Sequence, residues 1–178
     1  MSGEDYLIDK AQDADTGGAE EAVFESFLKD RGLKYTKARK TLLRKVFLMH
    51  DHFTAEQLLD RLKDDGIAAS KATVYRTLSV LLECSLLDAH DFGEGALYYE
   101  HTFGHQHHDH LFCLHCKRIM EFRDDEIEEH QERVTADLGF EMLSHSLNIY
   151  GICKDCGTKD STLTERYATG AHLRRSER

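Results

Sequence analysis

Proline and tryptophan are absent from the 178-residue sequence, and no apolar run approaches the roughly 20 residues that a membrane-spanning helix needs. Residues 1–18 are acidic and contain no apolar stretch, so they do not have the pattern of a secretory signal peptide. We therefore expect a cytoplasmic protein with no membrane association.

An overall positive charge is also lacking, because the net charge is −10. Taken alone, this value argues against a nucleic-acid partner. Between Lys29 and Lys45, however, the sequence has eight basic residues and only one acidic residue, Asp30. Local charge decides contact with phosphates. By charge alone, the segment fits either a DNA contact or an ordinary solvated helix face.

Capping signals and apolar periodicity predict four helices in the first half of the chain. The first covers Glu21–Arg31, and the second begins at Thr36 and runs to about Met49. A capping box at Thr54–Gln57 begins the third helix, which ends near Gly66. Ser70 caps a fourth helix, whose apolar stripe consists of Val74, Leu78, Leu81 and Leu82.

Two short strands, Leu86–His90 and Ala96–Glu100, are expected next, joined by a segment in which Gly93 and Gly95 permit a tight hairpin. Helices separated by a short turn and followed by a hairpin indicate a winged helix-turn-helix. We assign residues 19–101 to this domain, after a disordered acidic tail over 1–18.

The second half differs in composition, and residues 102–106 are a plausible hinge before it. Strands are predicted at His108–Cys113, Arg118–Phe122 and Phe140–Tyr150, with a helix from Asp124 to Leu138. The expected fold class is therefore α+β, with a second α/β domain over 107–162 and a polar tail over 163–178.

Four of the five cysteines form two CxxC pairs, Cys113–Cys116 and Cys153–Cys156. Two such pairs supply the four thiolates that Zn²⁺ binds in a tetrahedron. A thioredoxin-like redox pair does not explain two copies, so we favour a structural zinc knuckle with four cysteine ligands. Because 36 residues separate the pairs, the intervening chain must return to the first pair. Cys84 stands alone and is expected to be a small buried side chain.

A second group of metal-binding residue types is the run His107-His108-Asp109-His110. In an extended chain, His107 and Asp109 share one face and His108 and His110 share the other. The run thus offers two half-sites, which need further ligands; the candidates are His52, Glu100, Glu121, Glu128 and His145. Mixed His and carboxylate sets suit Fe²⁺, Mn²⁺ and Zn²⁺. A solvated, tag-like cluster is the alternative, but it leaves the flanking apolar strand unexplained, and His145 alone could be a core histidine.

Three segments resemble the ferric uptake regulator family: DGIAASKATVYRTL over 65–78, HHDHLFCLHC over 107–116 and HSLNIYGIC over 145–153. The resemblance runs from about Gly32 to Cys156. It implies a homodimeric, metal-dependent repressor in which the second domain provides dimerisation. Glutamates at 100 and 121 look more like the iron sensor than the peroxide sensor. The segment between Glu100 and His107 is one residue longer than is usual, and His101 and His105 have no clear counterpart.

The resemblance also implies roles for individual residues. The four paired cysteines would hold structural zinc. The regulatory metal, Fe²⁺ with Mn²⁺ or Zn²⁺ as alternatives, would bind between the domains to His52, Glu100, His108, His110 and Glu121. An additional metal would bind His107, Asp109, Glu128 and His145. Lys34 would contact the minor groove, Tyr75 thymine and Arg76 a phosphate. Independently of the resemblance, the local charge suggests that the basic cluster from Lys34 to Lys45 holds backbone phosphates, and Thr36 and Arg39 are further candidate DNA contacts within it.

These features predict a repressor of iron uptake and homeostasis genes that binds an AT-rich inverted repeat in double-stranded DNA, and not an enzyme. Zinc, manganese and peroxide sensing within the same family stay open, as does the pairing of dimers into tetramers. A zinc hydrolase would need an open metal position and a base, and there is no His-Glu-x-x-His motif. A metal-buffering protein would leave the basic cluster and the helix with Tyr75 and Arg76 unexplained.

Overall fold

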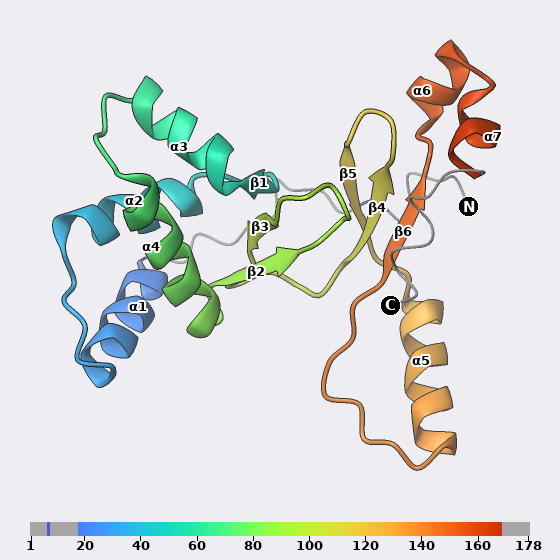
Figure 1. Cartoon of the computed structure of the whole chain (residues 1–178). Helices are drawn as coiled ribbons and strands as arrows, with labels where there is room; N and C mark the ends of the chain where they lie inside the picture. Colours follow the sequence, from blue (N-terminus) through green and yellow to red (C-terminus); the bar gives the residue numbers. More distant parts are fainter. Residues whose placement is uncertain (1–6, 8–17, 169–178) are drawn as a thin grey trace. The chain divides into compact units, whose positions relative to one another are not determined.

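The computed structural model describes Leu7 and residues 18–168, and these form two compact units. One unit consists of residues 18–106, and the other of Leu7 with residues 107–168 (Figure 1). The division falls at the end of the 102–106 segment, for which the hinge role stays a prediction. Residues 1–6, 8–17 and 169–178, which include most of both predicted tails, lie outside the described residues. Within the described ranges, no helix has the length and apolar character to cross a bilayer.

The 18–106 unit contains the four predicted helices, which are α1 (Ala19–Asp30), α2 (Lys37–Phe47), α3 (Ala55–Asp64) and α4 (Lys71–Glu83). Their apolar faces form one core that includes Phe24, Leu43, Leu58 and Leu78, each no more than 1% exposed. A helix can bury such a stripe only against other elements, so the four helices pack on one another and on the hairpin.

Three of these helices begin at the capping residues that the sequence predicts. The Thr36 hydroxyl accepts a hydrogen bond from the Arg39 amide, and Ser70 does the same for Thr73. At α3 both hydrogen bonds of the capping box between Thr54 and Gln57 are present. Each cap satisfies a backbone N–H that the first helical turn leaves unpaired, and this fixes where the helix starts.

A three-stranded antiparallel sheet completes the 18–106 unit, in the order β1 (Phe53–Thr54), β3 (Tyr98–His101) and β2 (Leu87–His90). Strand β1, which the sequence analysis does not predict, pairs with β3 where the Phe53 ring stacks on Tyr99 at 5.9 Å between centroids. Gly93 and Gly95 have positive φ values in the β2–β3 connection, which spans residues 91–97 and is longer than the predicted 91–95 turn, because β3 begins at Tyr98 and not at Ala96. Helices followed by this hairpin confirm the winged helix-turn-helix.

The 107–168 unit is built on a second three-stranded sheet, in the order β5 (Ile119–Phe122), β4 (Asp109–Cys113) and β6 (Asn148–Gly151). Strand β5 is antiparallel to β4, whereas β6 is parallel to it. A parallel neighbour requires a crossover, which helix α5 (Asp125–Asp137) and residues 138–147 supply (Figure 1). Mixed helix and sheet in this unit agree with the expected α+β class. Leu7 adds an isolated bridge to Phe122.

The predicted strand Phe140–Tyr150 is wrong over most of its length, because only residues 148–151 form β6. Residues 140–147 instead return the chain from the far end of α5, and Leu143 is 90% exposed. The alternation of Leu143, His145, Leu147 and Ile149 mimics a strand, but within the described chain residues 140–147 pair with no other strand. Periodicity alone cannot supply a pairing partner.

Two short helices end the described chain: α6 (Lys154–Lys159), within the predicted second domain, and α7 (Leu163–Ala168), within the predicted polar tail. Leu163 is only 1% exposed, because it packs against Cys113 and Cys156. One buried leucine anchors this short helix, although the surrounding residues are polar.

Candidate metal centres and DNA-contacting face

The two CxxC pairs meet because β6 lies parallel to β4, with Gly151 opposite Cys113. The Leu114 amide donates to the Gly151 carbonyl at 2.8 Å, which holds the first knuckle against the end of β6. The Cys153 amide donates to the Cys113 sulfur at 3.3 Å. The crossover thus supplies the return of the chain that the long spacing between the pairs requires.

The four sulfur atoms lie within 4.8 Å of one another. The Cys116 and Cys153 sulfurs are 3.7 Å apart. In tetrahedral zinc, Zn–S bonds of about 2.3 Å place sulfurs about 3.8 Å apart. None of the five cysteines, all of which lie in the described part of the chain, is in a disulfide. The donor set and its spacing therefore fit a structural Zn²⁺ ion.

Local hydrogen bonds also favour ionisation of one of the four thiols, that of Cys113. Burial alone would raise the pKa of the Cys113 thiol, but backbone N–H groups, that of Cys153 foremost, lower this pKa to about 6. At Cys156, burial and the neighbouring thiols raise the pKa to about 12. Without a cation, the four thiols cannot all ionise at neutral pH. A divalent ion removes this conflict because it stabilises every thiolate.

Helix α7 covers the cysteine cluster. Leu163 packs on Cys113 and Cys156, and Tyr167, Ile152 and Cys153 complete the apolar layer. Cys116 is the exposed member of the four. An apolar layer over a metal site limits the access of water, chelators and oxidants to the ligands.

Leu163→Ala should therefore loosen the cysteine site. We expect a loss of about 2–5 kcal/mol in the stability of this unit, because the substitution removes a buried side chain and leaves a cavity. Zinc transfer to a chromophoric chelator should become faster. Leu48→Ala, at a side chain 72% exposed, serves as the control. Equal melting temperatures and equal transfer rates for the two variants would contradict the covering role of α7.

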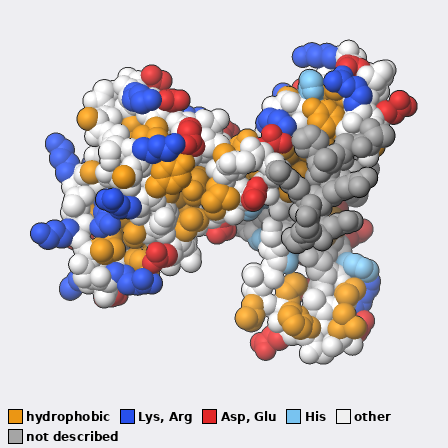
Figure 2. Space-filling model, in the orientation of Figure 1, with side chains coloured by type: hydrophobic (Ala, Val, Ile, Leu, Met, Phe, Trp, Pro, Cys, Tyr) orange, Lys and Arg blue, Asp and Glu red, His pale blue; other side chains and the backbone are white. Residues whose placement is uncertain are grey.

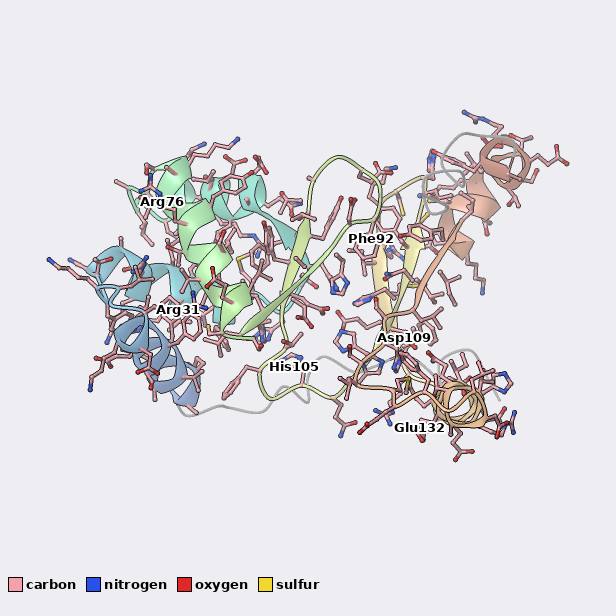
Figure 3. The ribbon with its side chains drawn as sticks, turned by 60° about the horizontal axis from the view of Figure 1, so that its bottom comes forward. Arg31, Arg76, Phe92, His105, Asp109 and Glu132 are labelled. Atoms are coloured by element: carbon pink, nitrogen blue, oxygen red, sulfur yellow. The ribbon has the colours of Figure 1, made fainter. Side chains whose placement is uncertain are left out.

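A second cluster in the 107–168 unit consists of His107, Asp109, Glu128 and His145, whose ligand atoms all lie within 4.8 Å of one another. The two histidine Nε2 atoms are 2.7 Å apart, and His145 Nε2 is 3.2 Å from Glu128 Oε2. His107 immediately precedes β4, Asp109 begins it (Figure 3), and Glu128 comes from the first turn of α5. His145 lies in the 140–147 return segment.

Two buried carboxylate oxygens of this cluster accept no hydrogen bond from the described residues. Asp109 is 1% exposed, and its Oδ1 accepts a hydrogen bond from the Leu147 amide at 3.3 Å. Asp109 Oδ2 and Glu128 Oε1 are buried without a hydrogen-bond partner among the described residues. Burying an uncompensated carboxylate oxygen is costly. A cation between two carboxylates and two imidazoles would offset that cost, so these residues fit a metal ion.

A third set of ligand types lies in the 18–106 unit. Glu100, on β3, contacts His52 Nε2 through Oε2 at 3.2 Å and His90 Nε2 through Oε1 at 2.5 Å. His52 comes just before the α3 capping box, and His90 ends β2. The sequence pattern alone does not identify His90 as a ligand. Its position two residues along β2 from Asp88, the residue paired with Glu100, was the available signal.

His108, His110 and Glu121 form a further set within the 107–168 unit. The His108 and His110 rings contact at 5.1 Å between centroids, and His108 Nε2 is 3.9 Å from Glu121 Oε2. Glu121 is directly opposite His110 in the antiparallel β4–β5 pair. The histidine run is therefore divided as the alternation predicts, with His107 and Asp109 in one set and His108 and His110 in the other.

The histidines at 50, 101 and 105 have a different environment. The His101 ring stacks on Phe47 at 5.1 Å and contacts His50 at 5.4 Å and His105 at 4.5 Å between centroids. His101 follows Glu100 on β3, so the two side chains point to opposite faces of the sheet. These three histidines pack beside the core and do not belong to the Glu100 set.

The candidate DNA-contacting residues lie on exposed parts of the 18–106 unit. Arg76 projects from α4 (Figure 3), and the exposed Tyr75 precedes it on the same helix. Lys34 lies in the segment between α1 and α2. Thr36 caps α2, and the Arg39 guanidinium donates to the Lys34 carbonyl at 2.9 Å. Lys and Arg side chains project from the outer edge of this unit in Figure 2. Lys34, Thr36, Tyr75 and Arg76 are thus exposed, the first two at the start of α2 and the last two on α4.

Comparison with known proteins identifies the family to which these sites belong. The family model described as "Ferric uptake regulator family" matches residues 30–150. The ferric uptake regulation protein of Campylobacter jejuni is 36% identical over 138 residues, which cover 76% of this chain and 87% of the relative.

Two solved structures resemble the chain. The Vibrio cholerae ferric uptake regulator, described as showing a rearrangement of its DNA-binding domains, has a TM-score of 0.63 and 38% identity, and the match covers 72% of this chain and 98% of that one. The Helicobacter pylori regulator, described as having three functional metal-binding sites, has a TM-score of 0.71 and 26% identity, with 85% and 95% covered. The family model covers well over half of the sequence, and the chain belongs to the ferric uptake regulator family.

Proposed function

We propose that the protein is a metal-dependent, DNA-binding repressor that controls genes of iron uptake and homeostasis in the cytoplasm. The observation that carries this proposal is the distribution of ligands. The unit with the winged helix contributes the His52, His90 and Glu100 set, and the other unit contributes the His108, His110 and Glu121 set. Neither set, with three ligand residues, fills the coordination sphere of a hard or borderline divalent metal by itself.

A regulatory ion that takes ligands from both units can bind fully in only one relative arrangement of the two. Such an ion has different affinities for the two states of the protein, which is the condition for a switch. Shifting the active fraction from 1% to 99% needs about 5.5 kcal/mol. Several metal–ligand bonds made only in the active arrangement are sufficient for this difference.

The winged helix supports DNA as the partner. Helix α4 is the second helix of the helix-turn-helix. Helix-turn-helix proteins insert this second helix into the major groove of DNA. The Tyr75 ring, 38% exposed, offers an apolar face to thymine methyl groups. Arg76, Thr36 and Arg39 would contact phosphates, and Lys34 would reach the minor groove. We infer an AT-rich inverted repeat as the operator.

An inverted repeat requires two copies of the chain, and the 107–168 unit has the apolar surface for pairing. Helix α5 has no buried residue in the single chain. The exposed apolar side chains on α5, the return segment and β6 are Val134, Leu138, Phe140, Leu143 and Ile149. Large exposed apolar surfaces mark protein–protein interaction sites, so these side chains support an interface. A dimer would place two α4 helices on half-sites about 10 base pairs apart.

The assignment of Cys113, Cys116, Cys153 and Cys156 to structural zinc completes the proposal. The His107 set would hold an additional ion. Iron as the regulatory metal is supported by the family, and manganese or zinc sensing are the alternatives within it. A hydrolase or a metal buffer is not favoured, because neither uses the winged helix.

The test is a fluorescence-anisotropy titration of operator DNA under anaerobic conditions, repeated with Fe²⁺, Mn²⁺ and Zn²⁺ alongside elemental analysis. We expect Fe²⁺ to strengthen DNA binding by about 100-fold, within the usual range of allosteric coupling. Affinity that is equal with and without each metal would overturn the proposal. A stronger response to Mn²⁺ or Zn²⁺ at physiological concentrations would move the protein to another branch of the family.

Arg76→Ala tests the phosphate contact. We expect weaker binding to all duplexes and a plot of log K against log salt that is less steep by about one unit, because one phosphate contact is lost. Arg133→Ala, in α5 of the other unit, is the control with the same change of charge. A changed base preference with unchanged affinity would contradict the phosphate role.

A further inference from the structure

We propose that Glu56 is a positioning residue for DNA recognition: its carboxylate holds the Tyr75 ring in place on α4 and also lowers the affinity for every duplex through its charge. The proposal rests on the DNA-binding function proposed above. It assigns a purpose to an acidic side chain that lies beside the residues expected to contact DNA.

The contacts form a closed triangle of side chains. The Tyr75 hydroxyl donates to Glu56 Oε1 at 2.9 Å, and Lys71 Nζ lies 3.0 Å from the same oxygen. Lys71 Nζ also lies 5.6 Å from the centre of the Tyr75 ring. Lys71 and Tyr75 are four residues apart on α4, so they share one helix face. The first turns of α3 and α4 are therefore linked at the exposed surface.

Both ends of this link are fixed by backbone structure. Glu56 is the second residue of α3, directly inside the capping box of Thr54 and Gln57. Lys71 is the first residue of α4, which Ser70 caps. The carboxylate thus has a defined place relative to α4. A tyrosine has only two side-chain torsions, so a hydrogen bond at its hydroxyl is enough to fix the ring.

Fixing the ring before DNA arrives has a recognition benefit. A ring already in its bound orientation loses less conformational entropy on binding, which favours the sequence that fits that orientation. Hydrogen bonds from Lys71 and then Tyr75 lower the pKa of Glu56, so the carboxylate is charged at neutral pH. Its charge opposes phosphates regardless of sequence, and this effect is separate from the positioning.

The two effects can be separated with two substitutions of the same residue. Glu56→Gln removes the charge but keeps an oxygen that accepts a hydrogen bond from Tyr75. Glu56→Ala removes both. Glu83→Gln, at the other end of α4, where Glu83 pairs with Arg31, is the control for net charge. Circular dichroism melting of each variant checks the fold.

The experiment uses the full-length, metal-loaded protein with a duplex selected by the wild type from a random library and with a scrambled duplex. Glu56→Gln should bind both duplexes about 3- to 10-fold more tightly, with an unchanged ratio of the two affinities. Glu56→Ala should lower that ratio by about 10-fold. Tyr75→Phe should lower it similarly, and adding Glu56→Ala to Tyr75→Phe should cause no further loss.

The positioning role would be overturned if Glu56→Ala kept the wild-type ratio of affinities for the selected and scrambled duplexes. It would also be overturned if the losses of this ratio in Glu56→Ala and Tyr75→Phe added in the double variant. A second measurement needs no DNA: the NMR signals of the isotopically labelled Tyr75 ring should shift towards averaged values in Glu56→Ala but not in Glu56→Gln. Unchanged ring signals in Glu56→Ala would also overturn it. Failure of the wild type to select any duplex would instead reject the proposed function itself.

Discussion

Cys113→Ser is expected to release zinc from the cysteine site and to unfold much of the 107–168 unit. Cys113 ends β4, contacts the Cys153 amide through its sulfur and lies under Leu163, so it joins the central strand, the second knuckle and α7. Structural zinc in small cysteine-rich sites contributes about 10–16 kcal/mol of apparent binding free energy, which is available only to the folded state. Serine does not replace a thiolate as a zinc ligand, so most of this contribution is lost.

The measurements are elemental analysis of the purified protein and calorimetric melting. We expect about one zinc ion fewer per chain and the disappearance of the transition of this unit at physiological temperature. Cys84→Ser is the matched control, because Cys84 is half-buried at the end of α4, where its thiol donates to the Leu81 carbonyl. A Cys113→Ser protein that retains its zinc would refute the assignment of the site.

His52→Ala is expected to abolish the stimulation of DNA binding by metal while leaving the fold and the oligomeric state intact. The substitution removes one imidazole from the Glu100 set and leaves the cysteine site untouched. Metal-dependent affinity should fall by about 100-fold, to the level of the metal-free wild type. Metal-independent, salt-sensitive binding should remain, because the basic surface is unchanged.

Anisotropy titrations with and without metal, together with analytical ultracentrifugation, test this expectation. His50→Ala is the matched control: it lies two residues earlier, and its ring contacts His101. Glu121→Ala should reproduce the His52→Ala result from the other unit. A His52→Ala protein that still responds fully to metal would reject His52 as a regulatory ligand.

Local signals in the sequence are sufficient to predict the starts of α2, α3 and α4. The hydroxyls of Thr36, Thr54 and Ser70 act on backbone amides three residues away, so all the information lies within one helical turn. The division of the histidine run is equally local, because it follows from the two-residue period of a strand. Membership of the family and the α+β class could be recognised from such motifs.

The sequence predictions fail where residues far apart in the chain determine the structure. Residues 140–147 have a strand-like alternation, but β4 pairs only with residues 148–151 of this segment. His90 joins Glu100 through the register of the β2–β3 hairpin, which depends on the length of the connecting turn. Leu163 is buried only because the zinc knuckles lie beneath it. None of these outcomes is visible in a window of a few residues.

Helix α7 also bears on how the protein can be shortened. The family model ends at residue 150, before both the second pair of cysteines and α7. A protein trimmed to that shared region would lose two zinc ligands, and one ending just after Cys156 would keep all four but leave Cys113 and Cys156 without the cover of Leu163. The sulfurs would then meet dissolved oxygen and peroxide directly. The cysteines of such a trimmed protein would be oxidised during storage. A purification tag is therefore better placed at the N-terminus than directly after Cys156.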